Sequence, residues 1–499
     1  MPQRKRGGDR GALSIVLHTH MPYVEGFGTW PFGEEWLWEA IVGSYVPLLE
    51  LLDRGAPLTL SLTPVLCDQL EAPGIATRFT AFVEQVRSHT HAEDAAGLRA
   101  GGHETLAREL ERSWQDYEGA LRAFERRRGD MLDAFSPHAQ WTSSATHAVL
   151  PLLASDAGAR LQVQGGIEAH RERFGEDAPK GRGWRGGFWL PECAYLPRLE
   201  PLLKDLGVRA TCIELTGIVP QGAPAHLQPL LGDAGLVLVP IDRASIALAW
   251  SDRGYPADGV YRDYHHHTVH HHNPWNNDGS DYDHERALAR AREHAADFVA
   301  RTIARLQRDG AGLPGGGLAV FAVDTELFGH WWYEGVAWLA AVVEECSRQG
   351  LELLRLDDAL ERIEPAPWAT LGDAASDRDG WRGLDERGER AITWGQDYDL
   401  STWSGTAVAE LTFAARAAEL EVLSAGADAG AAAVRELLAL QASDWPFMVS
   451  REIAAVYARE RFDGHRAALS QALLEGAEAD AAPLRNLAAC VRTGSLLGV

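Results

Sequence analysis

The chain has 499 residues, of which 46% are hydrophobic, so it is long and apolar enough to form one or two sizeable cores. Its 71 acidic residues outnumber its 47 basic ones and give a formal net charge of -24. Such a surface repels phosphate backbones and anionic lipid headgroups, which argues against nucleic acid or a membrane as a partner, whereas neutral sugars are indifferent to it.

Cysteine use and the shortness of the apolar runs indicate a cytoplasmic protein. The five cysteines are scattered and include no CxxC pair, as expected of reduced thiols rather than a disulfide framework. The first apolar run, residues 13–17, is too short for a signal-peptide core, and no run approaches the roughly 18 residues of a membrane span. We therefore expect a soluble, cytoplasmic monomer or dimer.

Short apolar runs that end in polar residues predict buried parallel strands. They lie at residues 13–17, 58–66, 187–190, 209–213, 236–240 and 318–323. Helical patterns separate them, among them residues 47–52, 146–153, 199–206 and 333–348. Strands that alternate with helices form a parallel sheet, and polar groups at the carboxyl ends of its strands are typical of a barrel active site. The expected fold is therefore an α/β barrel.

The expected domain organisation has two parts. Residues 1–365 would form the catalytic barrel, with a charged helical insertion at about 77–135 and a loop-rich segment at 251–283. Residues 366–499 would form a linker and an alanine-rich, helical C-terminal domain, in which Ser450 is a plausible helix start.

Two carboxylates at strand ends are candidates for chemistry. Glu192 follows an apolar strand and a proline, which suits either a buried nucleophile or a loop acid at the barrel rim. Asp324 ends the most apolar run, where an unpaired charge would be costly, and Glu326 lies two residues farther on the same face. One attacking and one proton-donating carboxylate are the minimum for glycosyl transfer, but the chemistry alone does not choose between Asp324 and Glu326.

Histidines cluster near the expected site. His18 and His20 share one face at the end of the first strand, and His147 and His330 are further candidates. A His-x-His pair also serves metal-dependent amidohydrolases, but here the later strand ends offer acids rather than more histidines, which favours substrate hydrogen bonding. The run at residues 265–272 has six imidazoles and suggests a mobile surface loop near the groove, without an assigned function.

Tryptophan is abundant, with 17 residues, many of them beside Gly, Asp and His. Sugar rings stack on indole, so a carbohydrate groove explains this pattern about as well as core packing does. The tryptophans in such polar segments are Trp30, Trp275, Trp331, Trp332, Trp394 and Trp403. Together with Asp444, Trp394 and Trp403 would either anchor the helical domain or form part of a sugar-binding wall.

In combination these residues resemble glycoside hydrolase family 57, and within it the α-1,4-glucan branching enzymes, over nearly the whole chain. The motifs that carry the resemblance are HTHMP (18–22), GGIEAHRERFG (165–175), GFWLPECAY (187–195) and VDTELFGHWWYEG (323–335). The segments with Trp394, Trp403 and Asp444 resemble the helical domain of these enzymes.

The resemblance implies an incomplete (β/α)7 TIM-like barrel with a helical insertion and an all-helical C-terminal domain that contributes to the cleft. It implies a retaining mechanism without metal or cofactor, in which Glu192 is the nucleophile, Asp324 is the acid/base and an α-glucan such as amylose or glycogen gains α-1,6 branches. The two carboxyl groups would lie about 5–5.5 Å apart, and the pKa of Asp324 would be raised. The expected substrate-binding residues are His18, His20, Trp30, His147, Tyr255, His330, Trp394, Trp403 and Asp444.

One segment departs from the family pattern. After residues 252–256 the chain becomes histidine-rich and is shorter than the family's loop, which covers the cleft and helps to exclude water. Tyr255 is the candidate for a surviving cleft contact. The change leaves an α-amylase or a 4-α-glucanotransferase on the same scaffold as alternatives, which the reaction products would distinguish.

Overall fold

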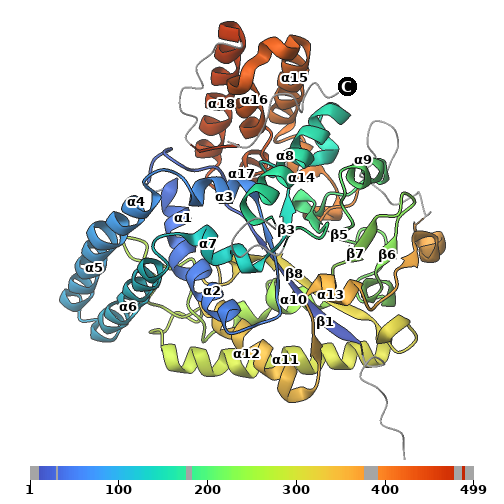
Figure 1. The fold of residues 1–499 in the computed structure, drawn as a ribbon. Helices are drawn as coiled ribbons and strands as arrows, with labels where there is room; N and C mark the ends of the chain where they lie inside the picture. The colour runs from blue at the N-terminus through green and yellow to red at the C-terminus, as the bar shows by residue number, and fades with distance from the viewer. Residues whose placement is uncertain (1–10, 30–31, 176–182, 376–390, 477–485, 489–499) are drawn as a thin grey trace, which may run out of the picture.

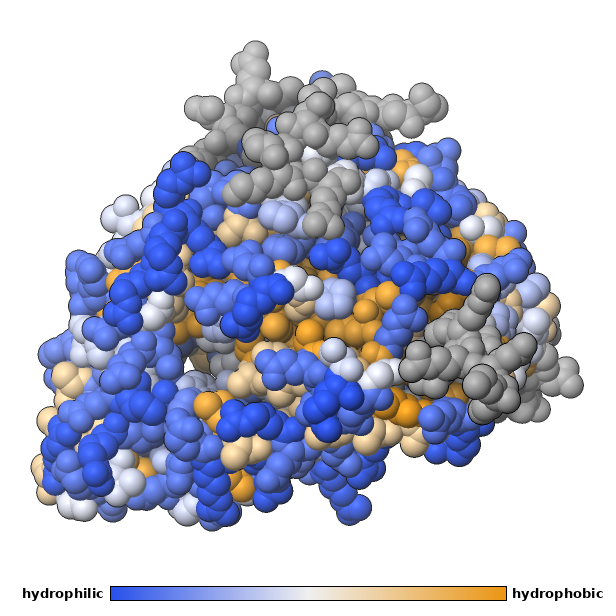
Figure 2. All heavy atoms as spheres, turned by 60° about the horizontal axis from the view of Figure 1, so that its bottom comes forward, coloured by the Kyte–Doolittle hydropathy of each residue, from blue (hydrophilic) through white to orange (hydrophobic). Residues whose placement is uncertain are grey.

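The computed structural model describes residues 11–29, 32–175, 183–375, 391–476 and 486–488, and Figure 1 shows their fold. A ring of parallel strands lies at the centre, with helices around it. None of the helices in these ranges has both the length and the apolar character needed to cross a bilayer. Figure 2 shows one face of the molecule as largely hydrophilic, with apolar atoms in a band across its middle.

The barrel is built around strand β1 (Ala12–Thr19), whose eight residues are all buried. β1 pairs in parallel with β2 (Thr59–Leu62) on one side and with β8 (Leu318–Asp324) on the other. The sheet continues through β3 (Ala139–Ser143) and β4 (Phe188–Trp189). Because both faces of these strands are covered, their residues are buried whether they are apolar or polar, except Asp324 at the end of β8.

A second sheet completes the ring. In it β5 (Ala210–Ile213) pairs in parallel with β7 (Val237–Pro240). A parallel bridge from Gly187 to Ala210 joins the two sheets, and the N–H of Asp242 donates to the carbonyl of Val320 at 2.8 Å, which links the end of β7 to β8. The second sheet runs in the order β10 (Ala366–Pro367), β6 (Leu230–Leu231), β7 and β5, with β6 antiparallel to β7. The short strand β9 (Glu352–Leu353) pairs with β1 in the first sheet. The predicted incomplete (β/α)7 barrel is confirmed.

Helices cover the outside of the barrel. They are α1 (Glu34–Ala40), α2 (Val46–Asp53), α3 (Pro64–Leu70), α8 (Asp156–Phe174), α9 (Glu200–Asp205), α10 (Arg243–Ala249), α11 (His284–Asp309), α12 (Gly335–Gln349) and α13 (Leu356–Leu360). A short π-helical stretch at Ile41–Tyr45 makes α1 and α2 one continuous rod. Residues 251–283 contain only a short 3-10 turn and isolated bridges, in agreement with their loop-like composition.

Two helical parts project from the barrel in Figure 1. One, which we call the arm, contains α4 (Ile75–Ala81), α5 (Ser88–Ala100), α6 (Glu104–Arg126) and α7 (Met131–Phe135). The other contains α14 (Ser401–Ser404), α15 (Ala409–Ala425), α16 (Gly430–Leu440), α17 (Asp444–Ser450) and α18 (Ala455–Glu475), packed around a core of their own.

Three predicted elements were wrong in detail. The run at 58–66 is not one strand, because Pro64 opens α3. Residues 146–153 are not a helix, because His147 has a φ of 60° and only a 3-10 turn follows. Ser450 ends α17 instead of starting a helix, because Glu452 and Ala454 have φ values of 57° and 52°, which interrupt the chain before α18.

The contact between α8 and β3 gives a stability prediction. A Cβ on Gly166 would lie 2.0 Å from the carbonyl oxygen of Ser143, so Gly166→Ala must push helix and strand apart and is expected to cost about 1–3 kcal/mol. We expect a lower midpoint of thermal unfolding. Gly97→Ala is the matched control, because its Cβ would meet nothing within 4 Å, and it should raise stability through helix propensity. Equal midpoints for both variants would contradict the packing described here.

Candidate active site

Glu192 lies directly after β4, in a tight turn at the carboxyl end of the barrel strands. Its backbone is left-handed, with φ 62° and ψ 20°, and Cys193 follows with φ 50°. Non-glycine residues adopt this conformation at a cost, so the surrounding structure must hold them in it. The turn directs the carboxylate toward segments that come from far along the chain.

Both oxygens of the Glu192 carboxylate accept a hydrogen bond. The indole N–H of Trp394 donates to Oε2 at 2.9 Å, and the hydroxyl of Ser443 donates to Oε1 at 2.8 Å. Burial raises the pKa of Glu192, and these two hydrogen bonds oppose that shift because they stabilise the ionised form.

Ser443 begins a chain of hydrogen bonds that runs into the barrel. Its Oγ lies 2.8 Å from Nδ1 of His147, whose Nε2 lies 2.9 Å from Nε2 of His18. Nδ1 of His18 in turn lies 3.2 Å from the hydroxyl of Ser61. Because burial keeps the pKa of both imidazoles well below its usual value, each is neutral and carries one proton. If the Ser443 proton points to Glu192, His147 must donate from Nδ1 to Ser443, and His18 must donate from Nε2 to His147.

His20 belongs to a second cluster. Its Nε2 lies 2.9 Å from Oδ1 of Asp444, its Nδ1 lies 3.2 Å from Thr63, and its ring stacks on His147 at 4.0 Å. Burial lowers the pKa of His20, but Asp444, with smaller contributions from Glu326 and Asp324, makes the net shift upward. All four ring nitrogens of His18 and His20 therefore have protein partners.

Asp324 and Glu326 have different surroundings. Asp324 lies opposite His18 in the register of β1 and β8. It is the one exposed residue of β8, although it lies deep among the surrounding elements. Burial, and then the charges of Glu326 and Glu192, raise the pKa of Asp324 well above its usual value. Glu326 instead accepts a hydrogen bond of 2.6 Å from the hydroxyl of Tyr45, and burial raises its pKa to about 7. Asp324 is thus the acid that faces a ligand.

The remaining predicted site residues lie in different places. Trp403 is buried and packs beneath Trp394, so it supports that ring. Tyr255 donates to Asp297 at 2.8 Å and packs against α11 and α12, not against the residues around Glu192. His330 lies next to Tyr264 in the lining of a separate cavity. Trp30 lies outside the described residues.

Ser443 was not among the sequence candidates, although it contacts the carboxylate directly. Its signal was weak, because a serine before Asp444 reads as an ordinary helix cap. Among the described residues, no group of three or more His, Cys, Asp and Glu is arranged to hold a metal ion.

Comparisons with known proteins agree with this arrangement. The sequence model described as "Glycosyl hydrolase family 57" matches residues 141–370, which include Glu192 and Asp324, and the one described as "1,4-alpha-glucan branching enzyme, C-terminal" matches residues 408–493. A probable 1,4-alpha-glucan branching enzyme of Mycobacterium tuberculosis is 31% identical, over 91% of this chain and 90% of that protein. The chain belongs to glycosyl hydrolase family 57.

Further relatives and solved structures extend the similarity. A 1,4-alpha-glucan branching enzyme of Thermococcus kodakarensis is 30% identical, over 91% of this chain and 72% of that protein. The crystal structure of the GH57-type branching enzyme of Pyrococcus horikoshii superposes with a TM-score of 0.84 at 27% identity, over 98% of this chain and 97% of that one. An α-amylase of Thermotoga maritima, with a TM-score of 0.75 at 21% identity and 93% of each chain covered, shares the fold.

Proposed function

We propose that this member of family 57 is a 1,4-α-glucan branching enzyme with Glu192 as nucleophile and Asp324 as acid/base. The observation that carries the proposal is the combination of a doubly hydrogen-bonded Glu192 with an Asp324 whose pKa is raised. These are the two states that a retaining glycosyl transfer needs, one carboxylate ionised and the other protonated. Further support comes from the relatives named as branching enzymes, which match most of the chain.

In the first step Glu192 attacks the anomeric carbon, and a C–O ester bond to the enzyme forms as the glycosidic C–O bond breaks. Asp324 gives its proton to the departing oxygen. In the second step the 6-hydroxyl of an acceptor glucan attacks the anomeric carbon, its proton passes to Asp324, and the ester bond to Glu192 breaks. Two inversions give net retention, and the product carries an α-1,6 linkage.

The surrounding side chains hold the two acids in these states. Trp394 and Ser443 stabilise the ionised Glu192 before attack and after release. Burial and then the charge of Glu326 keep the pKa of Asp324 high, which favours its protonated, proton-donating form. We assign His20, Trp394 and Asp444 to the binding of the sugar at the reacting bond, with Trp403 as the support of Trp394. His18 and His147 are buried and bonded to other side chains, and we assign them to holding Ser443 in place.

We propose a cytoplasmic role in glycogen synthesis, with amylose or glycogen as the partner and with neither nucleic acid nor membrane involved. The acid-rich surface and scattered cysteines support this. We further propose that residues 1–365 act as the catalytic barrel and that residues 366–499 complete its cleft, since Trp394, Ser443 and Asp444 all come from the latter.

Incubation with amylose tests the reaction. We expect abundant α-1,6 linkages by proton NMR with few new reducing ends, because the acceptor takes the glucan instead of water. Glu192→Gln and Asp324→Asn should each abolish the signal, and Glu421→Gln, at an exposed acid of α15, should leave it unchanged. Reducing ends without α-1,6 linkages would contradict the proposal and make the enzyme an amylase, and new α-1,4 products alone would make it a 4-α-glucanotransferase.

The pH profile tests the role of Ser443. Because its hydroxyl stabilises the ionised Glu192, Ser443→Ala should raise the pKa of that carboxyl and move the acid limb of kcat/KM to higher pH by about 1–2 units. The basic limb, which reports loss of the Asp324 proton, should stay in place.

Ser450→Ala at the other end of α17 is the matched control, because its hydroxyl donates to the Phe447 carbonyl and has no other side-chain hydrogen bond within the described part of the chain. An unshifted acid limb in Ser443→Ala would show that this hydrogen bond does not support the charge of Glu192.

A further inference from the structure

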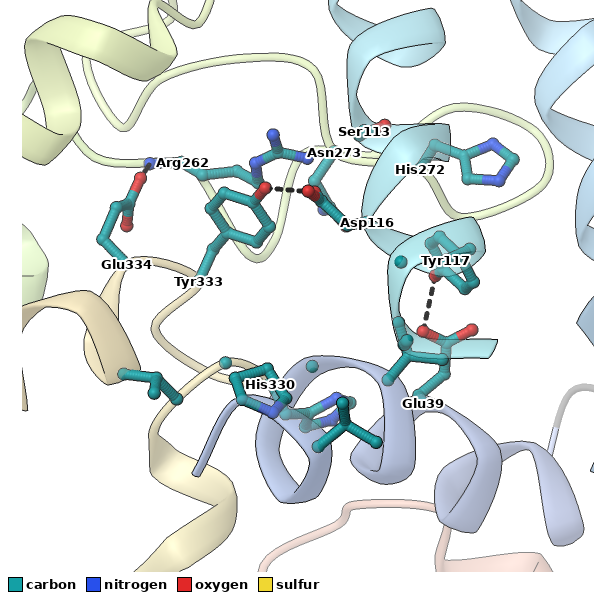
Figure 3. A pocket seen from close by; sticks show the side chains of 18 of the residues that line it. Glu39, Ser113, Asp116, Tyr117, Arg262, His272, Asn273, His330, Tyr333 and Glu334 are labelled. Atoms are coloured by element: carbon teal, nitrogen blue, oxygen red, sulfur yellow. Dashed lines mark hydrogen bonds between the residues drawn. The ribbon is translucent and has the colours of Figure 1, made fainter. Parts of the chain in front are cut away.

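A large cavity separates the arm from the barrel. Its volume is about 990 Å³, at the upper end of the roughly 300–1,000 Å³ typical of ligand sites, and its lining contains neither Glu192 nor Asp324. It lies between the α1–α2 rod, α6 of the arm, the histidine-rich segment and the start of α12 (Figure 3). Positions from Glu35 to Arg54 line it along one face of the rod, over roughly 28 Å at 1.5 Å per residue.

Several carboxylates in the cavity accept hydrogen bonds from an arginine or a tyrosine. Arg87 donates to Glu35 and to Glu39, each at 2.7 Å, and Tyr117 donates to Glu39 at 2.6 Å. Tyr333 faces Asp116 in the same way across the cavity (Figure 3). The lining contains acids and arginines side by side, without a cluster of one sign, and it offers many fixed hydrogen-bonding atoms. This mixture suits a neutral, hydroxyl-rich ligand better than an ion.

Aromatic rings and buried polar atoms without a partner also belong to residues of the lining. Trp36, Tyr264 and Trp331 line the cavity, the last two with ring centroids 4.4 Å apart, and sugar rings stack on such faces. Arg262 Nε and His272 Nε2 are buried and have no hydrogen-bond partner among the described residues. Such atoms are costly unless a ligand or solvent satisfies them.

The histidine-rich segment forms one wall, held by the arm. Nδ1 of His270 and Nδ1 of His272 each lie 2.8 Å from the carboxylate of Asp94 on α5, and the Thr268 hydroxyl also donates to it. Arg87 donates to the carbonyl of His270 at 3.0 Å. The run that the sequence left without a function is thus fixed in place as part of a cavity wall.

We propose that this cavity is a second α-glucan binding site, which holds a stretch of the chain away from the reacting bond. The segment after Asp324 leads directly to His330 and Trp331 in the cavity lining. The glucan held in the cavity therefore belongs to the Asp324 side of the glycosidic bond that is cleaved. On this side lie first the leaving chain and later the acceptor. The choice of α-glucan as ligand rests on the proposed function.

Two matched substitutions test the site by binding alone. In a Glu192→Gln background, Gly119→Trp on α6 places an indole in the cavity, and Gly97→Trp on α5 is the control outside it. A Cβ at either glycine meets nothing within 4 Å, and both substitutions improve helix propensity, so the fold should persist.

Affinities for maltotriose and for a long linear malto-oligosaccharide would be measured by calorimetry. We expect Gly119→Trp to weaken binding of the long ligand by tenfold or more and to leave maltotriose binding unchanged. Gly97→Trp should change the affinity for neither ligand. Asp94→Ala, which releases the histidine-rich wall, should also weaken binding of the long ligand alone.

The outcomes separate this proposal from the proposed function. If the Glu192→Gln protein binds both sugars and Gly119→Trp leaves the long-ligand affinity unchanged, the second site is overturned and the proposed function stands. If the Glu192→Gln protein binds neither sugar, the α-glucan function falls and the second site falls with it.

Discussion

The carboxylate of Glu192 is held at both oxygens by side chains that come from beyond the barrel. Trp394 and Ser443 donate to it from opposite directions, and the left-handed backbone at Glu192 and Cys193 turns it toward them. Either donor alone would leave one oxygen free to rotate away. The geometry of the site therefore depends on how the segment around Trp394 and the helix that begins after Ser443 sit on the carboxyl ends of the strands.

Proton positions follow from this arrangement. With the Ser443 hydroxyl directed to Glu192, His147 donates to Ser443 and His18 donates to His147. Both imidazoles stay neutral because they are buried. His20 differs, because Asp444 makes its protonated form more favourable. Imidazoles with a lowered pKa (His18 and His147) and one with a raised pKa (His20) thus lie in one stack.

The barrel and the two acids could be predicted because they depend on local patterns. Apolar runs that end in Glu192 and Asp324 identify buried strands with polar ends, and the structure has these strands. Strand β3 escaped prediction because its sequence AQWTS is polar although every residue is buried.

Contacts between distant segments could not be predicted. Ser443 and Glu192 are separated by 251 positions in the sequence, and Asp94 and His272 by 178. Neither contact produces a periodic pattern or a characteristic spacing in the sequence. Tyr255 shows the converse: a familiar local motif suggested a cleft contact, but the hydrogen bond to Asp297 draws its ring to α11.

The dependence of Glu192 on Ser443 also has a consequence for synthesis of the protein. The ribosome makes the chain from its amino end, so every barrel strand through β8 has emerged before Ser443 and Asp444 exist. A nascent chain with a folded barrel then has both acids but lacks the Ser443 hydroxyl on one and the Asp444 partner of His20. The site is complete only when α17 docks, so an unfinished chain cannot present the assembled machinery to cellular glucan.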